Sequence, residues 1–240
     1  MKNFKSIVSL AEKRKGGKEL LQELLPKFLS KAKLAQKGDD RFLAMMTKAV
    51  NQAGFKWSVI NNKWAQFEEA YYNFDIKKLS LLKPKDWQKY REDTRVVRNW
   101  QKIEATMKNL HLINSISKDY GSFAKFIANW SESDQIGLMD FLKQNGSRLG
   151  GYTAQWFLRY IGKDCFITTP DVIEAVKYTG REITKGTSKK DLKIIQEAFN
   201  DWHSESGLPY SHLSKIAAYS TGKNYDIESI KKEMKKQKDN

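Results

Sequence analysis

The sequence predicts an all-α fold, and three observations support this prediction. Only four prolines occur among the 240 residues, while Lys, Glu, Leu and Ala, which favour helix, are abundant. Apolar residues recur at the spacing of a helix, as in the stripe formed by Phe42, Met45, Met46, Ala49 and Val50. No run of alternating apolar and polar residues is long enough to build a sheet.

Local signals predict where the helices begin and end. Asp39 or Asp40 is expected to cap a helix that ends at Gly54. Other helices are expected at residues 19–25, 57–72, 84–90, 95–112, 120–130, 134–143, 154–161, from Pro170 through Val176, from Ser188 to Gly207, and at 211–219, while the tail after Asp226 is an amphipathic helix or a frayed segment. We expect a single helical unit, or two helical lobes with a core at about residues 40–180 flanked by residues 1–39 and 181–240.

The charge of the chain indicates a polyanionic partner. The formal net charge is +15 at pH 7, and a hydrophobic fraction of 40% excludes an intrinsically disordered chain. Such an excess of Lys and Arg favours nucleic acid over an anionic membrane surface as the partner. The alternative interpretation is a basic surface that only keeps the protein soluble.

Cysteine usage and hydropathy predict a cytoplasmic protein. A single cysteine, Cys165, excludes an intrachain disulfide and a cysteine-rich zinc site. The first ten residues are too short and too charged for a signal peptide, and no apolar stretch is long enough to span a bilayer. We therefore expect no membrane partner, no metal and no cofactor.

A short loop with three glycines, Gly146-Ser-Arg-Leu-Gly-Gly-Tyr-Thr-Ala154, precedes an apolar helical pattern that ends at Ile161. The first turn of a helix has free N–H groups and the positive end of the dipole, which suit a phosphate. We predict phosphate contacts from the backbone N–H groups of Leu149, Gly150 and Gly151 and from the side chains of Arg148 and Thr153. The alternative is an ordinary connection between two helices.

Two further stretches accompany this loop, namely Gln52-Ala-Gly-Phe-Lys-Trp57 and Asp93-Thr-Arg-Val-Val-Arg-Asn-Trp-Gln-Lys-Ile103. In this order, the three stretches resemble the DNA-3-methyladenine glycosylase I family, within the helix–hairpin–helix superfamily of DNA glycosylases. The resemblance covers about residues 40–180. It implies a helix–hairpin–helix glycosylase fold, a bundle of about ten helices with a cleft.

The chain also departs from the pattern of that family. The family's pocket glutamate lies eight positions before the tryptophan, where this chain has Ala49. The family's zinc site uses Cys and His ligands, whereas this chain offers one Cys and three scattered His. The resemblance therefore implies a divergent branch without zinc and with altered pocket chemistry.

The superfamily places an aspartate shortly after the hairpin helix, and Asp171 is the match in this chain. A carboxylate near the sugar would stabilise the positive charge that develops as the glycosidic bond breaks. The alternative is that Asp171 only complements a helix dipole, and Asp164 is a second candidate for the catalytic carboxylate. Tyr152 stands where strand-cleaving members carry a lysine, which implies that no Schiff base forms.

A flipped base also needs an aromatic pocket. The resemblance assigns Trp57 to this pocket, and we add Gln52, Phe55 and Tyr152; Trp64, Tyr71 and Tyr72 are nearby candidates. The resemblance therefore implies a monomeric, monofunctional glycosylase that removes alkylated purines such as 3-methyladenine from double-stranded DNA, and a bacterial-type protein associated with the nucleoid through that DNA. The alternatives are a non-catalytic DNA-binding protein on the same fold, favoured by Ala49, and an unrelated helical nucleic-acid binder.

Overall fold

The computed structural model describes residues 3–238, and these residues form α-helices and short 3-10 turns without any strand. The helices are α1 (Phe4–Lys15), α2 (Lys18–Glu23), α3 (Lys31–Ala35), α4 (Asp39–Gln52), α5 (Trp57–Asn62), α6 (Trp64–Ala70), α7 (Ile76–Ser80), α8 (Pro84–Lys89), α9 (Trp100–Tyr120), α10 (Phe123–Asn129), α11 (Gln135–Asn145), α12 (Tyr152–Ile161), α13 (Pro170–Tyr178), α14 (Lys189–Ser206), α15 (Tyr210–Ser220) and α16 (Ile227–Lys238), with 3-10 turns η1 (Tyr72–Phe74) and η2 (Glu132–Asp134). The all-α prediction is confirmed. The helices outnumber the expected ten or so, because several of them are only one or two turns long.

None of the helices between residues 3 and 238 combines the length and the apolar character that crossing a bilayer requires.

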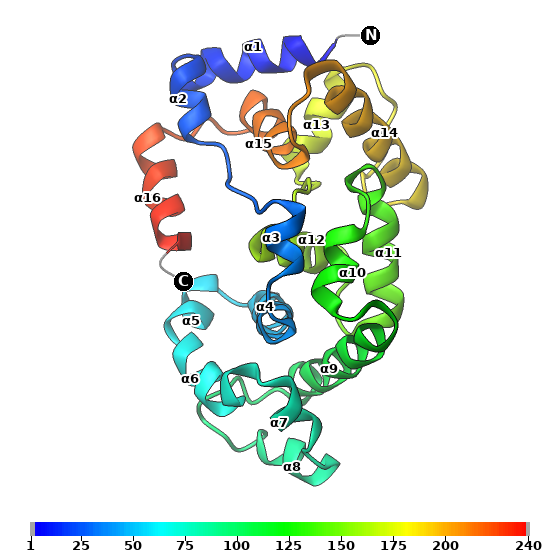
Figure 1. Ribbon diagram of the computed structural model, residues 1–240. Coiled ribbons are helices and arrows are strands. Elements are labelled where there is room, and N and C mark those ends of the chain that lie inside the picture. Colours follow the sequence, from blue (N-terminus) through cyan, green and yellow to red (C-terminus); the bar gives the residue numbers. More distant parts are fainter. Residues whose placement is uncertain (1–2, 239–240) are drawn as a thin grey trace. The chain divides into compact units, whose positions relative to one another are not determined.

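The chain divides into two compact units. The first, which we call the terminal unit, comprises residues 1–28, 131–136 and 164–240. Its core joins the two ends of the chain, since α1 packs against α15 (Figure 1). The ring of Phe4 lies 5.0 Å from that of Trp202, and Phe166 stacks on Phe199 at 4.3 Å. Residues from both ends of the sequence are therefore needed to bury this core.

The second unit, which we call the central unit, comprises residues 29–130 and 137–163. Its centre is α4, which packs against α9 and α12 (Figure 1). Phe42 of α4 is fully buried and makes edge contacts with Phe123 of α10 and Phe157 of α12, at 5.6 and 6.3 Å between ring centres. The predicted glycine-rich loop connects α11 to α12 within this unit.

Several predicted boundaries differ from the structure. The helix expected to end at residue 112 continues to Tyr120, and the helix expected from residue 120 begins at Phe123. The helix expected from residue 95 begins at Trp100, because the side chain of Asn99 caps it by accepting a hydrogen bond from the N–H of Lys102. The helix expected at residues 57–72 is split into α5 and α6. Asp39 does not cap its own helix, because its carboxylate accepts hydrogen bonds from the N–H groups of Phe123 and Ala124 at the start of α10.

A left-handed turn follows α6. Tyr72, Asn73 and Phe74 have φ angles of 53°, 54° and 62°, in the region that L-residues seldom occupy. Arg41 of α4 holds the turn by donating to the carbonyl of Asn73, and it also pairs with Glu68 at 2.8 Å. This turn ends the helical run from Trp57 that the sequence pattern predicts to continue to Tyr72.

The Gly/Thr/Ser/Lys-rich loop before α14 is organised around one carboxylate. Asp191 is buried, and it accepts hydrogen bonds from the N–H groups of Thr184, Lys185 and Gly186 at 2.9 to 3.2 Å. Burial alone would raise the pKa of Asp191, but hydrogen bonds from Thr184, Gly186 and Ser188 outweigh it and hold the pKa well below its usual range.

Asp191→Asn is expected to lower the Tm at pH 7 by several degrees, because the amide keeps only one acceptor oxygen for these donors. The folded pKa lies below the unfolded value of about 3.9, so the carboxylate stabilises the fold fully above that pH and less as the pH falls. Thermal unfolding at pH 7 and pH 3 checks this expectation. The difference in Tm between wild type and variant should be smaller at pH 3 than at pH 7. Asp201→Asn, which removes an exposed pair with Arg181, is the control and should change the Tm little. A gap that stays constant with pH would contradict the expectation.

Candidate nucleic-acid interface and base site

The loop between α11 and α12 presents unpaired donors to solvent. Gly151 has φ 56° and ψ −130°, a conformation open to glycine, and Arg148 before it has φ 59°. Among the described residues, none accepts a hydrogen bond from the backbone N–H of Leu149, Gly150 or Gly151. Gly150 is half-buried and Gly151 is exposed. The loop, which we call the hairpin, thus has the donors that an anion at the start of α12 would need.

The hairpin is held in place from α9. Asn109 is fully buried, and its side chain accepts from the N–H of Ser147 at 2.7 Å and donates to the carbonyl of Ser147 at 3.1 Å. Gln101 accepts a hydrogen bond from Arg148 at 2.9 Å. Leu149 is 1% exposed with its backbone included, so its N–H is less accessible to a ligand than the backbone of Gly150 or Gly151. The hairpin is therefore fixed by packing and by two side chains of one helix.

The predicted base-pocket residues lie around the end of α4 and the start of α5. Gln52 is 7% exposed, and its amide donates to the side chain of Asn61 at 3.1 Å. Phe55 is 43% exposed on the turn after α4, and Trp57 is the first residue of α5. Ala49 is buried one turn before Ala53. The structure places Gln52, Phe55 and Trp57 on one continuous segment, which we call the pocket turn (residues 52–57).

Trp57 belongs to an aromatic cluster that also includes Trp156 and Tyr160 of α12. Trp57 meets them edge to face at 5.1 and 6.0 Å, while Trp156 stacks on Tyr160 at 5.4 Å. These two partners were not predicted, although their i, i+4 spacing on α12 is a signal that the sequence contains. Tyr152, four residues before Trp156, is 44% exposed at the first position of α12.

The other aromatic candidates lie elsewhere. Trp64 stacks on Phe67 and Phe74, both at 5.5 Å. Tyr71 is 1% exposed and packs against Tyr90 at 4.6 Å. Trp64 and Tyr71 are thus packing residues around the left-handed turn, on which Tyr72 is exposed. Their aromatic character reflects the core of the central unit.

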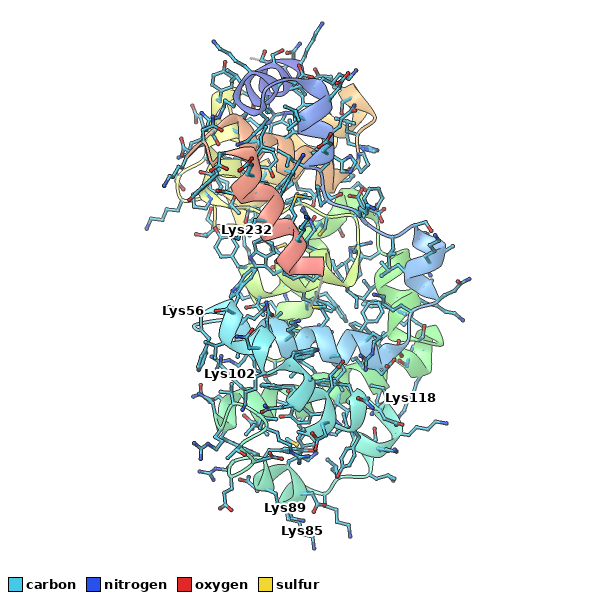
Figure 2. All side chains as sticks on the ribbon, turned by 90° about the vertical axis from the view of Figure 1, so that its left-hand side faces the viewer. Lys56, Lys85, Lys89, Lys102, Lys118 and Lys232 are labelled. Carbon is cyan, nitrogen blue, oxygen red and sulfur yellow. The ribbon has the colours of Figure 1, made fainter. Side chains whose placement is uncertain are left out.

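Lys102 of α9, labelled in Figure 2, connects to the pocket turn. Its amine donates to the carbonyls of Asn51 and Ala53, at 2.9 and 2.8 Å, and lies 4.3 Å from the centre of the Phe55 ring. Burial, with a smaller contribution from the nearby charge of Arg148, lowers the pKa of Lys102 to about 8. Lys102 was not predicted as a site residue, although it lies in the stretch Asp93–Ile103 that carries part of the family resemblance.

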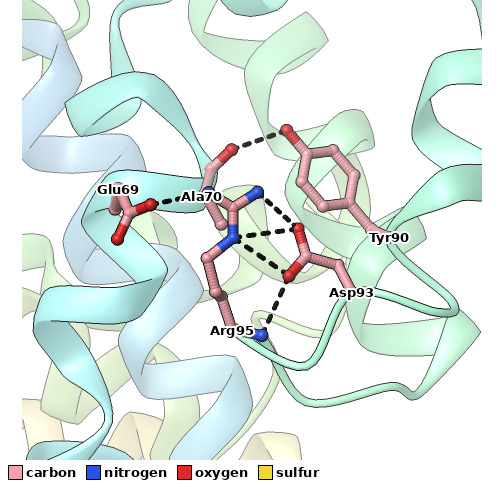
Figure 3. Close-up of polar contacts among 5 residues, drawn as sticks. All are labelled: Glu69, Ala70, Tyr90, Asp93 and Arg95. Carbon is pink, nitrogen blue, oxygen red and sulfur yellow. Dashed lines mark hydrogen bonds and ion pairs between the residues drawn. The ribbon is translucent and has the colours of Figure 1, made fainter.

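The stretch that contains Lys102 begins with Asp93 and Arg95, which hold the segment before α9 in place (Figure 3). Arg95 pairs with Asp93 at 2.7 Å and with Glu69 at 2.9 Å, and Tyr90 donates to the carbonyl of Ala70 at 2.8 Å. Hydrogen bonds from Arg95 hold the pKa of Asp93 below its usual range. These contacts tie the segment before α9 to α6, and so support the helix that carries Lys102.

The two candidate catalytic carboxylates belong to the terminal unit and differ in their contacts. Asp164 caps α15, because its two oxygens accept from the N–H groups of Tyr210 and Ser211 at 3.0 and 2.7 Å. Asp171 lies in the first turn of α13, and no donor to its carboxylate is found among residues 3–238. It lies so close to Gly222 that a Cβ atom there would be 2.0 Å from its Oδ1.

The Cys and His residues that the structure describes do not form a site for the zinc ion that the resemblance associates with the family. Cys165 is buried, and ring nitrogens of His203 and His212 bond to the carbonyls of Leu208 and Pro26. Within the described part of the chain, no group of three His, Cys, Asp or Glu side chains could hold a metal ion.

The comparisons with known proteins agree with the sequence motifs. The family of methyladenine glycosylases matches residues 33–144, a segment that contains the pocket turn and α9 up to its end and stops just before the hairpin. A DNA-3-methyladenine glycosylase of Haemophilus influenzae is 30% identical over 80 residues, which are 33% of this chain and 42% of that protein. The chain thus matches less than half the length of this relative.

Solved structures of similar proteins include a variant of 3-methyladenine DNA glycosylase I (TAG) in complex with 3-methyladenine, at 24% identity over 60% of this chain and 84% of that one, with a TM-score of 0.47. The enzyme from Staphylococcus aureus is 25% identical over 58% of this chain and 83% of that one, with a TM-score of 0.45. Over residues 33–144 the chain matches the methyladenine glycosylase family, which confirms the resemblance predicted from its sequence motifs.

Proposed function

We propose that this protein is a monofunctional DNA glycosylase that removes an alkylated purine, with 3-methyladenine as the first candidate, from double-stranded DNA. The observation that carries the proposal is the family match over residues 33–144, which includes the pocket turn with its buried amide, Gln52, and its tryptophan, Trp57. An enzyme that acts on a base must flip it out of the duplex and hold it against aromatic side chains. We propose that it acts as a monomer without a cofactor.

The hairpin supports the DNA-binding part of this proposal. Backbone N–H groups and Arg148 would contact phosphates, which positions a duplex without reading its sequence. The formal net charge of +15 adds non-specific attraction. Binding is then expected to weaken steeply with salt.

The chemistry that we propose is hydrolysis at the C1′ atom of the flipped nucleotide. Water adds to C1′ and loses one proton to the solvent as the bond to the base breaks, and the carboxylate of Asp171 stabilises the positive charge on the sugar. A purine methylated at N3 already carries a positive charge and leaves as a neutral molecule, so the leaving group needs no acid. Because the base leaves as a neutral molecule, catalysis is compatible with Ala49 at the position of the family's glutamate. Tyr152 at the lysine position supports excision without strand cleavage.

A second function is a non-catalytic DNA-binding protein on the same fold. The observation that favours it is Ala49, because a methyl group can neither accept a hydrogen bond from a base nor balance its charge. Such a protein would hold a damaged site without releasing the base.

Release of free base from methylated duplex DNA tests the proposal. Wild type is expected to release 3-methyladenine, and Asp171→Asn to reduce the single-turnover rate by about 100-fold or more, because the carboxylate charge is lost next to a developing cation. Asp164→Ala is the control: it removes the side chain that caps α15, and should cost about 1 kcal/mol of stability but leave the rate at 25 °C unchanged.

The outcomes separate the hypotheses. An unchanged rate in Asp171→Asn would remove this residue from the chemistry. No release from any lesion in a panel, together with tighter binding of damaged than of undamaged duplex, would favour the non-catalytic protein. Neither release nor preferential binding would overturn both functions.

A further inference from the structure

Lys102 reaches a place where the backbone carries partial negative charge. The last carbonyls of a helix have no partner within the helix and form the negative end of its dipole. At the end of α4, the amine of Lys102 satisfies two such groups, the carbonyls of Asn51 and Ala53, at 2.9 and 2.8 Å. Lys102 is itself 5% exposed, so water does not replace it easily in this position.

These contacts fix the path of the pocket turn. The backbone leaves the helix at Ala53 and turns at Gly54, which has φ 80°. The same amine lies 4.3 Å from the ring centre of Phe55, a cation–π contact. A single side chain therefore holds the turn at two carbonyls and one ring, and Trp57 follows two residues later.

The charged group that acts on Lys102 is a second cation, and no carboxylate is found to offset it among the described residues. Arg148 of the hairpin is the charged group that acts on it among the described residues, and it disfavours the cation. α4 supplies backbone carbonyls and the pocket turn supplies an aromatic ring, neither of which carries a full negative charge. Arg148 is bonded to Gln101, the neighbour of Lys102 on α9. The hairpin and the pocket turn thus meet at adjacent residues of one helix.

We propose that Lys102 is a positioning residue of the base site, whose charged amine holds the pocket turn in the conformation that receives the flipped base. The inference rests on the proposed function, since it concerns how the base is held. It does not place Lys102 in contact with the reacting atoms.

The proposal predicts a pH dependence. With a pKa of about 8, Lys102 is cationic in roughly 90% of molecules at pH 7 and in roughly 10% at pH 9. The neutral amine binds the two carbonyls more weakly, because charge-assisted hydrogen bonds are the stronger ones. Base release is therefore expected to decline above about pH 8 as one proton is lost.

Lys102→Met and Lys102→Arg test the proposal, with Lys48→Met as the matched control. Lys48 is also a buried lysine of the central unit, at 5% exposure, and its amine lies 5.0 Å from the ring of Trp64, one of the packing residues around the left-handed turn. Lys102→Met should lower kcat/KM for base release by about 10- to 100-fold and abolish the decline above pH 8. Lys102→Arg, which stays cationic, should recover activity and show no decline, while Lys48→Met should keep the wild-type profile.

Hydrogen–deuterium exchange of the free protein gives a readout that does not depend on activity. The amides of residues 53–57 should exchange faster in Lys102→Met than in wild type, whereas those of α12 should not change. If the wild type released no base, this would contradict the proposed function. The exchange result would still decide whether Lys102 holds the pocket turn. A Lys102→Met protein with unaltered exchange at residues 53–57, or with the wild-type pH profile, would overturn the inference.

Discussion

Gly151→Asp is expected to weaken duplex binding by about 100-fold. Two effects combine at this position. A side chain at φ 56° and ψ −130° strains the backbone by about 1–3 kcal/mol, and a carboxylate at the start of α12 repels the phosphate that the hairpin would bind, where about 1.4 kcal/mol is a factor of ten in affinity. Fluorescence anisotropy with a short duplex, measured across a salt titration, checks this expectation.

Two control variants separate strain from charge. Gly151→Ala carries the strain alone, because a Cβ atom at this position meets no other atom within 4 Å, so its affinity should lie between those of wild type and Gly151→Asp. Gly207→Asp places the same charge at another glycine with open space around it, at φ 68° and ψ 4° after α14 of the terminal unit, and so controls for the added charge. It should leave affinity unchanged. Equal affinities of Gly151→Asp and wild type at all salt concentrations would remove the hairpin from the DNA interface.

Trp57→Ala is expected to slow base release by about 10- to 100-fold, because stacking a base on an aromatic side chain contributes about 1–3 kcal/mol. The loss should be larger if Trp156 and Tyr160 relax into the vacant space, since both rings contact Trp57. Single-turnover release from methylated duplex measures the effect. Trp57→Phe keeps a flat ring and should retain more activity.

Trp100→Ala is the matched control for Trp57→Ala. Trp100 is also a half-buried tryptophan at the first position of a helix, in this case α9. The two alanine variants should therefore lose similar amounts of stability while only Trp57→Ala loses activity. Similar rates for both variants would show that Trp57 acts through folding and not by holding the base.

Local chemistry in the sequence predicts helix ends well where a cap is made by neighbours in the chain. Ser188 caps α14 through the N–H of Asp191, Thr169 caps α13 before Pro170, and Gly162 ends α12 with φ 100°. Each of these signals acts within four residues. Such helix ends are therefore readable without any knowledge of the fold.

Contacts between distant residues explain what could not be predicted. Asp39 caps a helix that begins at residue 123, and Arg95 pairs with Glu69 of α6 in the segment that precedes α9. The candidate site also depends on contacts between residues that are far apart in the sequence. The sequence indicates Trp57 and the hairpin as separate features, but nothing local shows that Trp156 lies beside Trp57 or that Lys102 reaches the carbonyl of Ala53.

The joining of both chain ends in the terminal unit has a consequence for synthesis. Residues 29–163 leave the ribosome before α13 to α15 exist, so the central unit can complete its core during translation. α1 is made before α13 to α15, so Phe4 and Ile7, which share a core with residues of these helices, stay partly uncovered until they have been synthesised. A circular permutant that starts at residue 29 and links the old ends would shorten this wait, and we expect it to refold with less aggregation than the natural order.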